Sequence, residues 1–410
     1  MSSGQVPVRK SGPGIGSERM SKTLATQAGH LPGVIEGLLH SLVDQGYELG
    51  VQTAVYLHGE LVAEVCVGRV ASASPQAVAA DHLFPVCSTG KGILATLVHI
   101  LAERGQIAYD APVARYWPEF AAHGKGATTV RQALAHQAGL PQVPAFRSLA
   151  EACDFPAACA RVAELAPAWP AGSTTQYHSR TWGWIVGGLA ERASGRPLAH
   201  LLRDEVAGPL GLAEEMFFGI SAAADARFSA FEAQPVQREQ NTTAPITNAP
   251  PPPGTVPELA LPLMDFVNLP QVRRCCMPAV NGIMSARAIA RHYAALIGPV
   301  DGVRLIPAAR LAQATTLVTA PGTIPVCFGH GFGLGYSLKG PATDMGAFFG
   351  HGGAGGSEGM ANRALGLAVG LTKNRMDTHV QAPGHTNRLL ITALLDVLGH
   401  AGDGGFYRDG

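Results

Sequence analysis

Three short stretches of this sequence carry residue types that together can perform nucleophilic catalysis. In the first, "CSTGKGILATLVHIL", Ser88 and Lys91 stand at the start of an apolar run with helical spacing. Residues three positions apart share one face of a helix, so the alcohol and the amine lie side by side. A serine hydroxyl needs a base within reach, and a lysine whose pKa is lowered by burial can serve. An N-cap serine followed by a solvated lysine is the alternative for this motif taken alone.

Two later stretches supply further groups that such a serine needs. Tyr177, in "YHSRTWGW", can carry a proton as phenolate when it lies beside a lysine. In "FFGHGGAGGSEGM" a strand-like run leads into a glycine-rich segment, where a ligand can lie close to backbone N–H groups. The N–H of Ser88 at the helix start and the N–H of Ala354 are therefore candidates for an oxyanion hole. A packing tyrosine and a glycine-rich turn are the alternatives.

In the order S-x-x-K, Y-x-S, H-G-G, the three stretches resemble the serine β-lactamase/penicillin-binding-protein superfamily, specifically the class C-like branch with the family VIII carboxylesterases. The resemblance extends over about residues 30 to 400 and includes "GKGATTVRQALAHQAGLP" and "GFGLGY". It implies an acyl-enzyme on Ser88, with Lys91 and Tyr177 sharing the general base and acid work. The N–H groups of Ser88 and Ala354 would hold the oxyanion. The substrate-binding positions that it implies are Ser179, His351, Gly352 and Gly353.

Three departures from the class C pattern affect the expected substrate. Ser179 stands where class C β-lactamases usually carry asparagine, and His351 stands where they carry the lysine of K-T-G. Histidine is only partly charged near neutral pH, so it is a weaker partner for the carboxylate of a β-lactam or peptide. Glu358 is an acid where an apolar residue is expected, and it would repel anionic acyl groups if it faced the site.

These departures favour a serine carboxylesterase acting on small to medium acyl esters. An acyltransferase of the same fold and a β-lactamase or D-amino-acid peptidase are the alternatives. A non-catalytic binding protein is a further class, but binding alone does not need a serine, a lysine and a tyrosine together. We expect a small-molecule ester as substrate, and no cofactor. The fifteen histidines form no H-E-x-x-H or H-x-H cluster, so we expect no metal site.

Two weaker signals compete with this interpretation or extend it. "GGSEG" matches the nucleophile elbow G-x-S-x-G, but Ser357 follows a glycine-rich run and precedes a turn and a strand instead of a helix. We therefore interpret Ser357 as a decoy. Trp182, Phe348 and Phe349 are candidates for an apolar lining of the site, although aromatic residues near a sheet are usually core.

The elements that must position these residues come from both ends of the chain. "GVQTAVYLH" and "ELVAEVCVG" predict an antiparallel hairpin that turns at His58-Gly59, and "FGLGYSL", "AFFGH" and "LGLAVGLTK" predict further strands before a closing helix, "NRLLITALLDVLG". We expect an α/β fold of the β-lactamase/transpeptidase-like type, with one antiparallel sheet built from both chain ends and flanked by helices. The expected divisions are a disordered tail 1–25, an α/β domain 26–110 and 279–400, a mostly helical inserted domain 111–278 with a Pro-rich loop 234–278, and a C-terminal tail 401–410.

Composition sets outer limits on the function. The chain of 410 residues is 47% hydrophobic and carries 30 basic and 30 acidic residues, with no long basic run for a nucleic-acid or membrane surface. Seven cysteines follow no C-x-x-C spacing and indicate thiols in a reducing compartment. An N-terminus without an apolar core of the signal-peptide type, and the lack of a long apolar run, favour a cytoplasmic location. Assembly into a homo-oligomer stays open.

Overall fold

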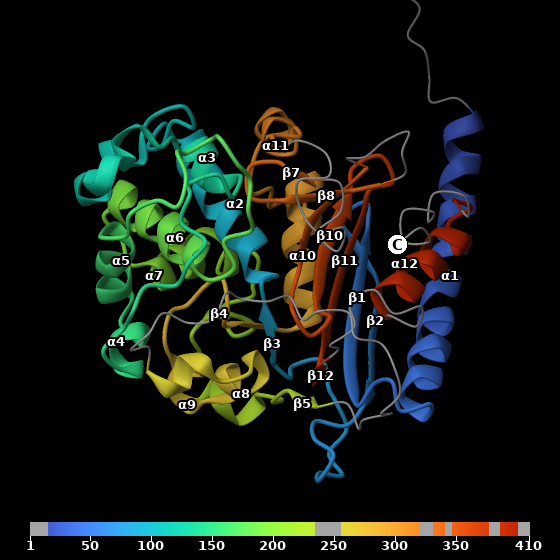
Figure 1. Cartoon of the computed structure of the whole chain (residues 1–410). Helices are drawn as coiled ribbons and strands as arrows, with labels where there is room; N and C mark the ends of the chain where they lie inside the picture. Colours follow the sequence, from blue (N-terminus) through green and yellow to red (C-terminus); the bar gives the residue numbers. More distant parts are fainter. Residues whose placement is uncertain (1–14, 234–255, 320–330, 341–346, 377–385, 401–410) are drawn as a thin grey trace, which may run out of the picture.

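A seven-stranded antiparallel sheet forms the centre of the molecule in a computed structural model, which describes residues 15–233, 256–319, 331–340, 347–376 and 386–400 (Figure 1). Its strand order is β2-β1-β11-β10-β9-β8-β7. The strands are β1 (Gly50–Leu57), β2 (Glu60–Gly68), β7 (Gly331–Phe332), β8 (Ser337–Lys339), β9 (Phe348–Gly352), β10 (Glu358–Asn362) and β11 (Leu367–Lys373).

The pairing of β1 with β11 joins the two ends of the chain. Val51 lies opposite Lys373 and Leu57 lies opposite Leu367, so the register is continuous along both strands. Every residue of β1 and β11 is buried, as expected for central strands with a layer on each face of the sheet. The edge strand β2 instead alternates buried and more exposed positions. The predicted hairpin and the predicted sheet from both chain ends are confirmed.

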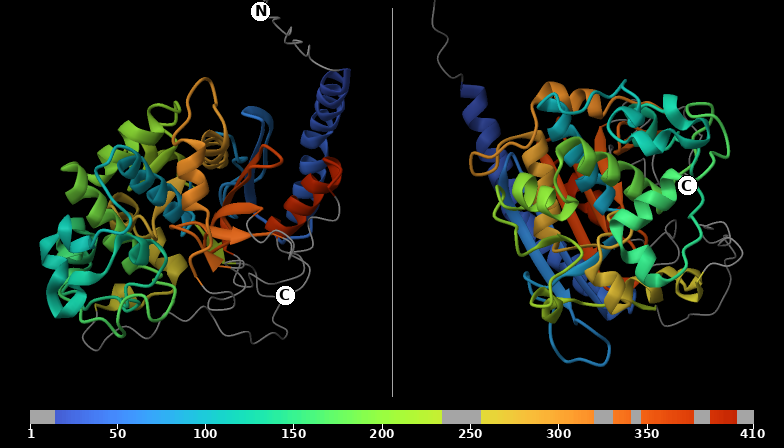
Figure 2. Two further views of the ribbon diagram at one scale, coloured as in Figure 1. Left: turned by 90° about the horizontal axis from the view of Figure 1, so that it is seen from above. Right: turned by 90° about the vertical axis from the view of Figure 1, so that its left-hand side faces the viewer.

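Helices cover both faces of the sheet (Figures 1 and 2). On one face α1 (Ile15–Asp44) and α12 (Thr386–Val397) pack side by side over the β1–β2 hairpin, and leucine and isoleucine side chains of both helices enter the core there. On the other face α10 (Ala286–Ile297) lies against β1, β10 and β11. Gly370 permits this contact, because a Cβ there would meet the Ala286 carbonyl oxygen at 2.2 Å.

The middle of the chain forms the helical region on the side of the molecule away from α1 and α12 (Figure 2). It is linked to the sheet through α2, which packs against α6 and also contacts β9. A small sheet of order β3-β6-β4 lies between the two parts, and β5 pairs in parallel with β12. The bounds are β3 (Phe84–Cys87), α2 (Gly90–Glu103), η1 (Val113–Arg115), η2 (Pro118–Ala127), α3 (Val130–Leu134), α4 (Leu149–Cys153), α5 (Phe155–Ala163), α6 (Thr181–Ser194), α7 (Leu198–Leu202), η3 (Arg203–Ala207), β4 (Met216–Phe218), η4 (Ala224–Arg227), β5 (Glu232–Ala233), η5 (Pro257–Ala260), α8 (Leu263–Asn268), α9 (Pro270–Arg274), β6 (Gly282–Met284), α11 (Ala308–Ala314) and β12 (Arg375–Met376).

Two boundaries differ from the sequence-based expectation. The tail predicted for 1–25 is too long, because α1 begins at Ile15. Glycine and serine concentrate before residue 18, whereas "ERMSKTLATQA" consists largely of good helix formers. The loop predicted for 234–278 is also too long, because α8 and α9 lie within it and bury Phe266 and Val272 in the core. The run Pro250–Pro253 lies outside the described residues.

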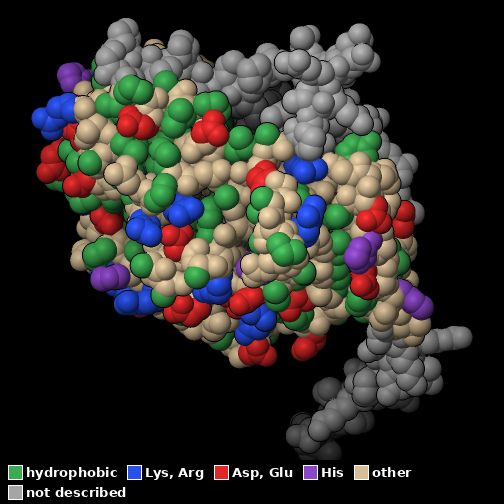
Figure 3. Space-filling view, turned by 90° about the horizontal axis from the view of Figure 1, so that it is seen from below, with side chains coloured by type: hydrophobic (Ala, Val, Ile, Leu, Met, Phe, Trp, Pro, Cys, Tyr) green, Lys and Arg blue, Asp and Glu red, His purple; other side chains and the backbone are tan. Residues whose placement is uncertain are grey.

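The face of the molecule that lies at the bottom of Figure 1 carries side chains of both charges. Figure 3 shows acidic and basic side chains interspersed over this face, with no single-sign patch among the described residues. Among the helices of the described ranges, none combines the length and apolar character that crossing a membrane requires.

Candidate active site

Ser88 lies in the short connection between β3 and α2. Cys87, the last residue of β3, adopts a φ of +44°, in the left-handed region that non-glycine residues seldom occupy. The chain therefore changes direction sharply immediately before the serine. Lys91 lies in the first turn of α2, and its Nζ is 2.7 Å from Ser88 Oγ. The structure thus brings together the alcohol and the amine that the sequence places three residues apart.

The Lys91 side chain is completely buried, and its surroundings are uncharged acceptors. Besides Ser88 Oγ, its Nζ donates to the backbone carbonyl of Ser179 at 2.8 Å and to that of Ala279 at 3.1 Å. Burial lowers the pKa of Lys91 from its ordinary value of 10.5 to about 7, because the charged form loses its hydration. At neutral pH, Lys91 is therefore a neutral amine in roughly half of the molecules. Ser179 takes part through its backbone, and the role of Ala279 has no signal in the sequence.

Tyr177 lies beside the serine–lysine pair. Lys91 Nζ lies over its ring, 4.9 Å from the ring centre. The Tyr177 ring also stacks with the ring of Phe332 in β7, at 6.0 Å between centroids, and the centroid of the His351 ring lies 6.1 Å from it. The structure therefore brings Tyr177 to the serine and the lysine from a second stretch of the chain. Phe332 belongs to the "GFGLGY" stretch, but nothing in the pattern of that stretch marks this phenylalanine as a residue of the site.

His136 holds the backbone on both sides of Tyr177, a role that the sequence analysis missed. Its carbonyl accepts the N–H of Gln176 at 3.2 Å, and its Nδ1 accepts the N–H of His178 at 3.1 Å. Its ring also lies 4.7 Å from the Tyr177 ring, between centroids. Burial lowers the pKa of His136 well below its ordinary value, so the ring is neutral and Nδ1 stays available as an acceptor. The φ of His136 is +60°, which marks a backbone held in place by its surroundings.

His351 lies in β9 with no exposed surface. Its Nδ1 is 2.7 Å from the Gly352 carbonyl oxygen. Burial, reinforced by the charge of Lys91, lowers the pKa of His351 to about 3. The expectation that this histidine is partly charged near neutral pH is therefore wrong, because the site denies it the water that would stabilise the imidazolium. A neutral imidazole offers no fixed positive charge to a substrate carboxylate.

The glycine-rich turn after β9 packs directly on the end of β3. A Cβ at Gly353 would lie 2.1 Å from the Val86 carbonyl oxygen, so only glycine permits this approach. Ser357 donates to the same Val86 carbonyl at 2.8 Å, and its Oγ is 3.0 Å from Thr89 Oγ1. These contacts hold the turn with Gly352 and Ala354, both half-buried, next to the strand end that leads into Ser88. Ser357 is buried and precedes β10 instead of a helix, as the decoy interpretation requires.

Glu358 points away from the candidate site. It lies opposite Gly352 in the β9–β10 pair, whereas His351 lies opposite Gly359, so Glu358 and His351 project from opposite faces of the sheet. On its own face the Glu358 carboxylate binds Lys339 Nζ at 2.8 Å and Asn387 Nδ2 of α12 at 3.2 Å. Its negative charge is therefore neutralised behind the sheet and does not act on an acyl group at Ser88.

The aromatic lining expected from the sequence is not found. Trp182 is buried and donates from Nε1 to the Leu134 carbonyl. Phe348 belongs to the core on the α1 and α12 face, and Phe349 packs against Tyr293 and Tyr336 in the core on the other face. These three side chains fill the interior, as aromatic residues near a sheet usually do. Among the described residues there is also no group of three histidine, cysteine or acidic side chains that could hold a metal.

The sheet from both chain ends, the inserted helical region and the serine at the start of α2 define an enzyme of the β-lactamase/transpeptidase-like fold. The chain belongs to the β-lactamase family, which matches residues 35–394, and it is a hydrolase. It is 32% identical over 354 residues to the esterase/β-lactamase LipL of Mycobacterium tuberculosis (strain ATCC 25618 / H37Rv), covering 80% of this chain and 77% of the relative.

Two solved structures extend the comparison. A family VIII carboxylesterase has a TM-score of 0.75 at 28% identity, with 90% of this chain and 97% of that chain covered. A penicillin-binding-protein homologue from Caulobacter crescentus has a TM-score of 0.75 at 29% identity, with 89% and 97% covered. The predicted family resemblance and the predicted fold class are confirmed.

Proposed function

We propose that this hydrolase is a serine carboxylesterase that cleaves small to medium acyl esters through an acyl-enzyme on Ser88. The observation that carries the proposal is the buried Lys91, with its amine 2.7 Å from Ser88 Oγ and a pKa lowered to about 7. In the neutral amine, two N–H groups satisfy the carbonyls of Ser179 and Ala279. The lone pair is then left for the proton of the Ser88 hydroxyl.

Acylation follows from this arrangement. Ser88 Oγ attacks the carbonyl carbon of the ester, and its proton passes to Lys91 Nζ. The N–H groups of Ser88 and Ala354 hold the oxyanion. Gly352 and Gly353 contribute by letting this turn pack closely, because a Cβ at Gly352 would meet Glu358 and a Cβ at Gly353 would meet the Val86 carbonyl. The Lys91–Tyr177 pair returns a proton to the leaving alcohol. Water then attacks the acyl-enzyme while the same pair removes its proton. The bond to Ser88 Oγ breaks, the pair returns that proton to Ser88 Oγ, and the carboxylic acid is released.

An ester is a better substrate for this site than a β-lactam or a D-amino-acid peptide. β-Lactams and D-amino-acid peptides carry a carboxylate, and the neutral His351 provides no positive charge to bind it. The Ser179 side chain also lacks the amide of the class C asparagine. A β-lactamase is the second candidate, because the relative LipL carries both activities in its name.

Acyl transfer is a variant of the same chemistry, in which an alcohol or amine replaces water in the second step. We propose that the Pro-rich segment 234–278 controls the access of such an acceptor. Since α8 and α9 within it contribute buried core residues, a test by deletion must spare them and remove residues between 236 and 254. An unchanged ratio of transfer to hydrolysis would contradict that role.

Labelling with a fluorophosphonate, followed by peptide mapping, tests the nucleophile. We expect one adduct on Ser88 in the wild type, and loss of both adduct and p-nitrophenyl butyrate turnover in Ser88→Ala. Ser357→Ala is the matched control and should keep both. An adduct on Ser357 would show that the decoy is the nucleophile, and nitrocefin turnover equal to ester turnover would favour the β-lactamase instead.

A further inference from the structure

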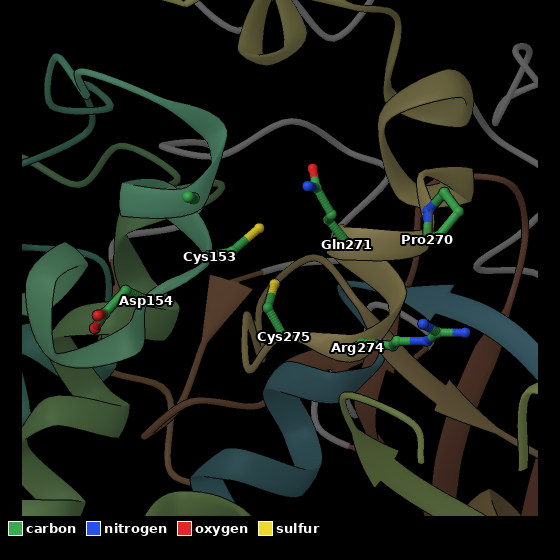
Figure 4. Close-up of a pocket in the computed structure, with 7 residues that line it drawn as sticks. Cys153, Asp154, Pro270, Gln271, Arg274 and Cys275 are labelled. Atoms are coloured by element: carbon green, nitrogen blue, oxygen red, sulfur yellow. The ribbon is translucent and has the colours of Figure 1, made fainter. Parts of the chain in front are cut away.

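Two thiols face each other on the helical side of the molecule. Cys153 is the last residue of α4, and Cys275 follows the end of α9. Figure 4 shows their sulfur atoms pointing toward one another from the two elements. Both cysteines are free and half-buried. They line a cavity of about 520 Å³ that also includes Ala150, Asp154, Pro270, Gln271 and Arg274.

The two thiols are not equivalent. Cys275 Sγ donates its hydrogen to the Val272 carbonyl at 3.3 Å, and the interaction between the two cysteine side chains lowers the pKa of the Cys153 thiol. The same interaction, together with burial, raises the pKa of Cys275. Cys275 Sγ also accepts a contact from Asn281 Nδ2 at 3.8 Å, so its own segment holds this thiol. Because the thiolate is the reactive form of cysteine, we assign Cys153 as the thiol that reacts first and Cys275 as the resolving thiol. A reactive thiol beside a second thiol is the arrangement that redox-active cysteines share.

We propose that Cys153 and Cys275 form a reversible redox pair that a peroxide converts into a disulfide between α4 and the segment after α9. The Cys153 thiolate attacks one oxygen of the peroxide and breaks the O–O bond, which gives a sulfenic acid and, after protonation, water. The Cys275 sulfur then attacks the sulfenic sulfur and releases a second water. Two thiols and one hydrogen peroxide thus give one disulfide and two waters, with two electrons passing from sulfur to oxygen.

The surroundings explain why the bond fits the fold. Asn281 ties the backbone around Cys275, since its Nδ2 donates to the carbonyls of Val272 and Cys275 and its Oδ1 accepts the N–H of Met277. The backbone position of Cys275 is therefore fixed. Cys153 is the last residue of the short helix α4, which contacts α9. The disulfide would close a loop of roughly 120 residues, which restricts the unfolded chain and raises the thermal stability of the oxidised form.

The test uses the full-length reduced protein and a small excess of hydrogen peroxide. We expect the intact mass to fall by two hydrogens, and non-reducing peptide mapping to give one cross-linked pair, Cys153 with Cys275. Dithiothreitol should restore the original mass. The melting temperature should rise on oxidation in the wild type. A cross-link between other cysteines, or oxidation of Cys153 to a sulfinic acid without a cross-link, would overturn the proposal.

Variants separate the two thiols and guard against misfolding. In Cys275→Ser the Cys153 sulfenic acid has no partner, so dimedone should trap it there, whereas in Cys153→Ser it should label neither position. Cys276→Ser and Cys66→Ser are matched controls that should still form the cross-link. The wild-type peptide map decides the proposal even if a variant folds poorly. None of these measurements depends on esterase turnover, so their outcome is independent of the proposed function.

Discussion

The pH dependence of acylation is the sharpest test of the role assigned to Lys91. The chemistry needs the neutral amine, and burial lowers the pKa of Lys91 to about 7. At pH 7 about half of the molecules then hold a neutral amine, against about 0.03% at the ordinary value of 10.5, a gain of roughly 1,500-fold in reactive enzyme. Below the pKa, each further decrease of one pH unit lowers the fraction of neutral amine about tenfold, so the rate at pH 5 should be about fiftyfold lower than at pH 7.

The assay is kcat/KM for p-nitrophenyl butyrate between pH 5 and 9, with product followed at its isosbestic wavelength. Since the ester does not titrate, kcat/KM reports ionisations of the free enzyme. We expect a rise with pH that levels off above about pH 8. His351→Gln is the control, because the pKa of His351 is lowered to about 3 and it does not change charge in this range. Its acid limb should stay in place even if its rate is lower.

Two outcomes would refute the reasoning. A rate that still rises tenfold per unit up to pH 9 would mean that Lys91 keeps an ordinary pKa and that its burial does not lower it. A rate that stays flat down to pH 5 would mean that the proton of the Ser88 hydroxyl goes elsewhere.

Three other predictions follow from single contacts. Lys91→Met should abolish turnover, yet raise the free energy of unfolding in urea at pH 6 by about 1–3 kcal/mol. The pKa of Lys91 is lower in the folded state than in the unfolded state, so the stability of the wild type rises between about pH 7 and 10.5. The stability advantage of the variant should therefore shrink over that pH range. His136→Asn, which keeps an acceptor and tolerates a positive φ, should retain several-fold more kcat than His136→Ala with similar KM; equal losses would contradict the positioning role. Gly353→Ala should lower kcat/KM at least about tenfold, since its Cβ meets the Val86 carbonyl, whereas Gly298→Ala, with open space around it, should not.

The parts of this fold that the sequence predicts are those set by local pattern. The β1–β2 hairpin follows from two β-rich runs around His58-Gly59, and the pairing of Ser88 with Lys91 follows from helical spacing. These features depend on residues close together in the chain, where periodicity and turn chemistry act directly.

What the sequence left out depends on distant contacts. The carbonyl of Ala279 and the ring of Phe332 reach the site only through tertiary packing, and a backbone carbonyl has no signature in sequence. The charge of His351 was misjudged because its burial is a property of the folded sheet. Likewise Glu358 could not be assigned to a face until the register of β9 and β10 was known.

The pairing of β1 with β11 also has a consequence for synthesis on the ribosome. The hairpin of β1 and β2 emerges early, but the strand that covers its open edge begins at Leu367, about 300 residues later. At translation rates of about 5–20 residues per second, that edge waits roughly 15–60 seconds for its neighbour. During this interval the nascent chain presents the unpaired backbone groups of a strand that is buried along its whole length in the finished fold, a ready template for pairing with another chain. The yield of folded enzyme should therefore depend on temperature and on chaperones that shield the hairpin until the last strands arrive.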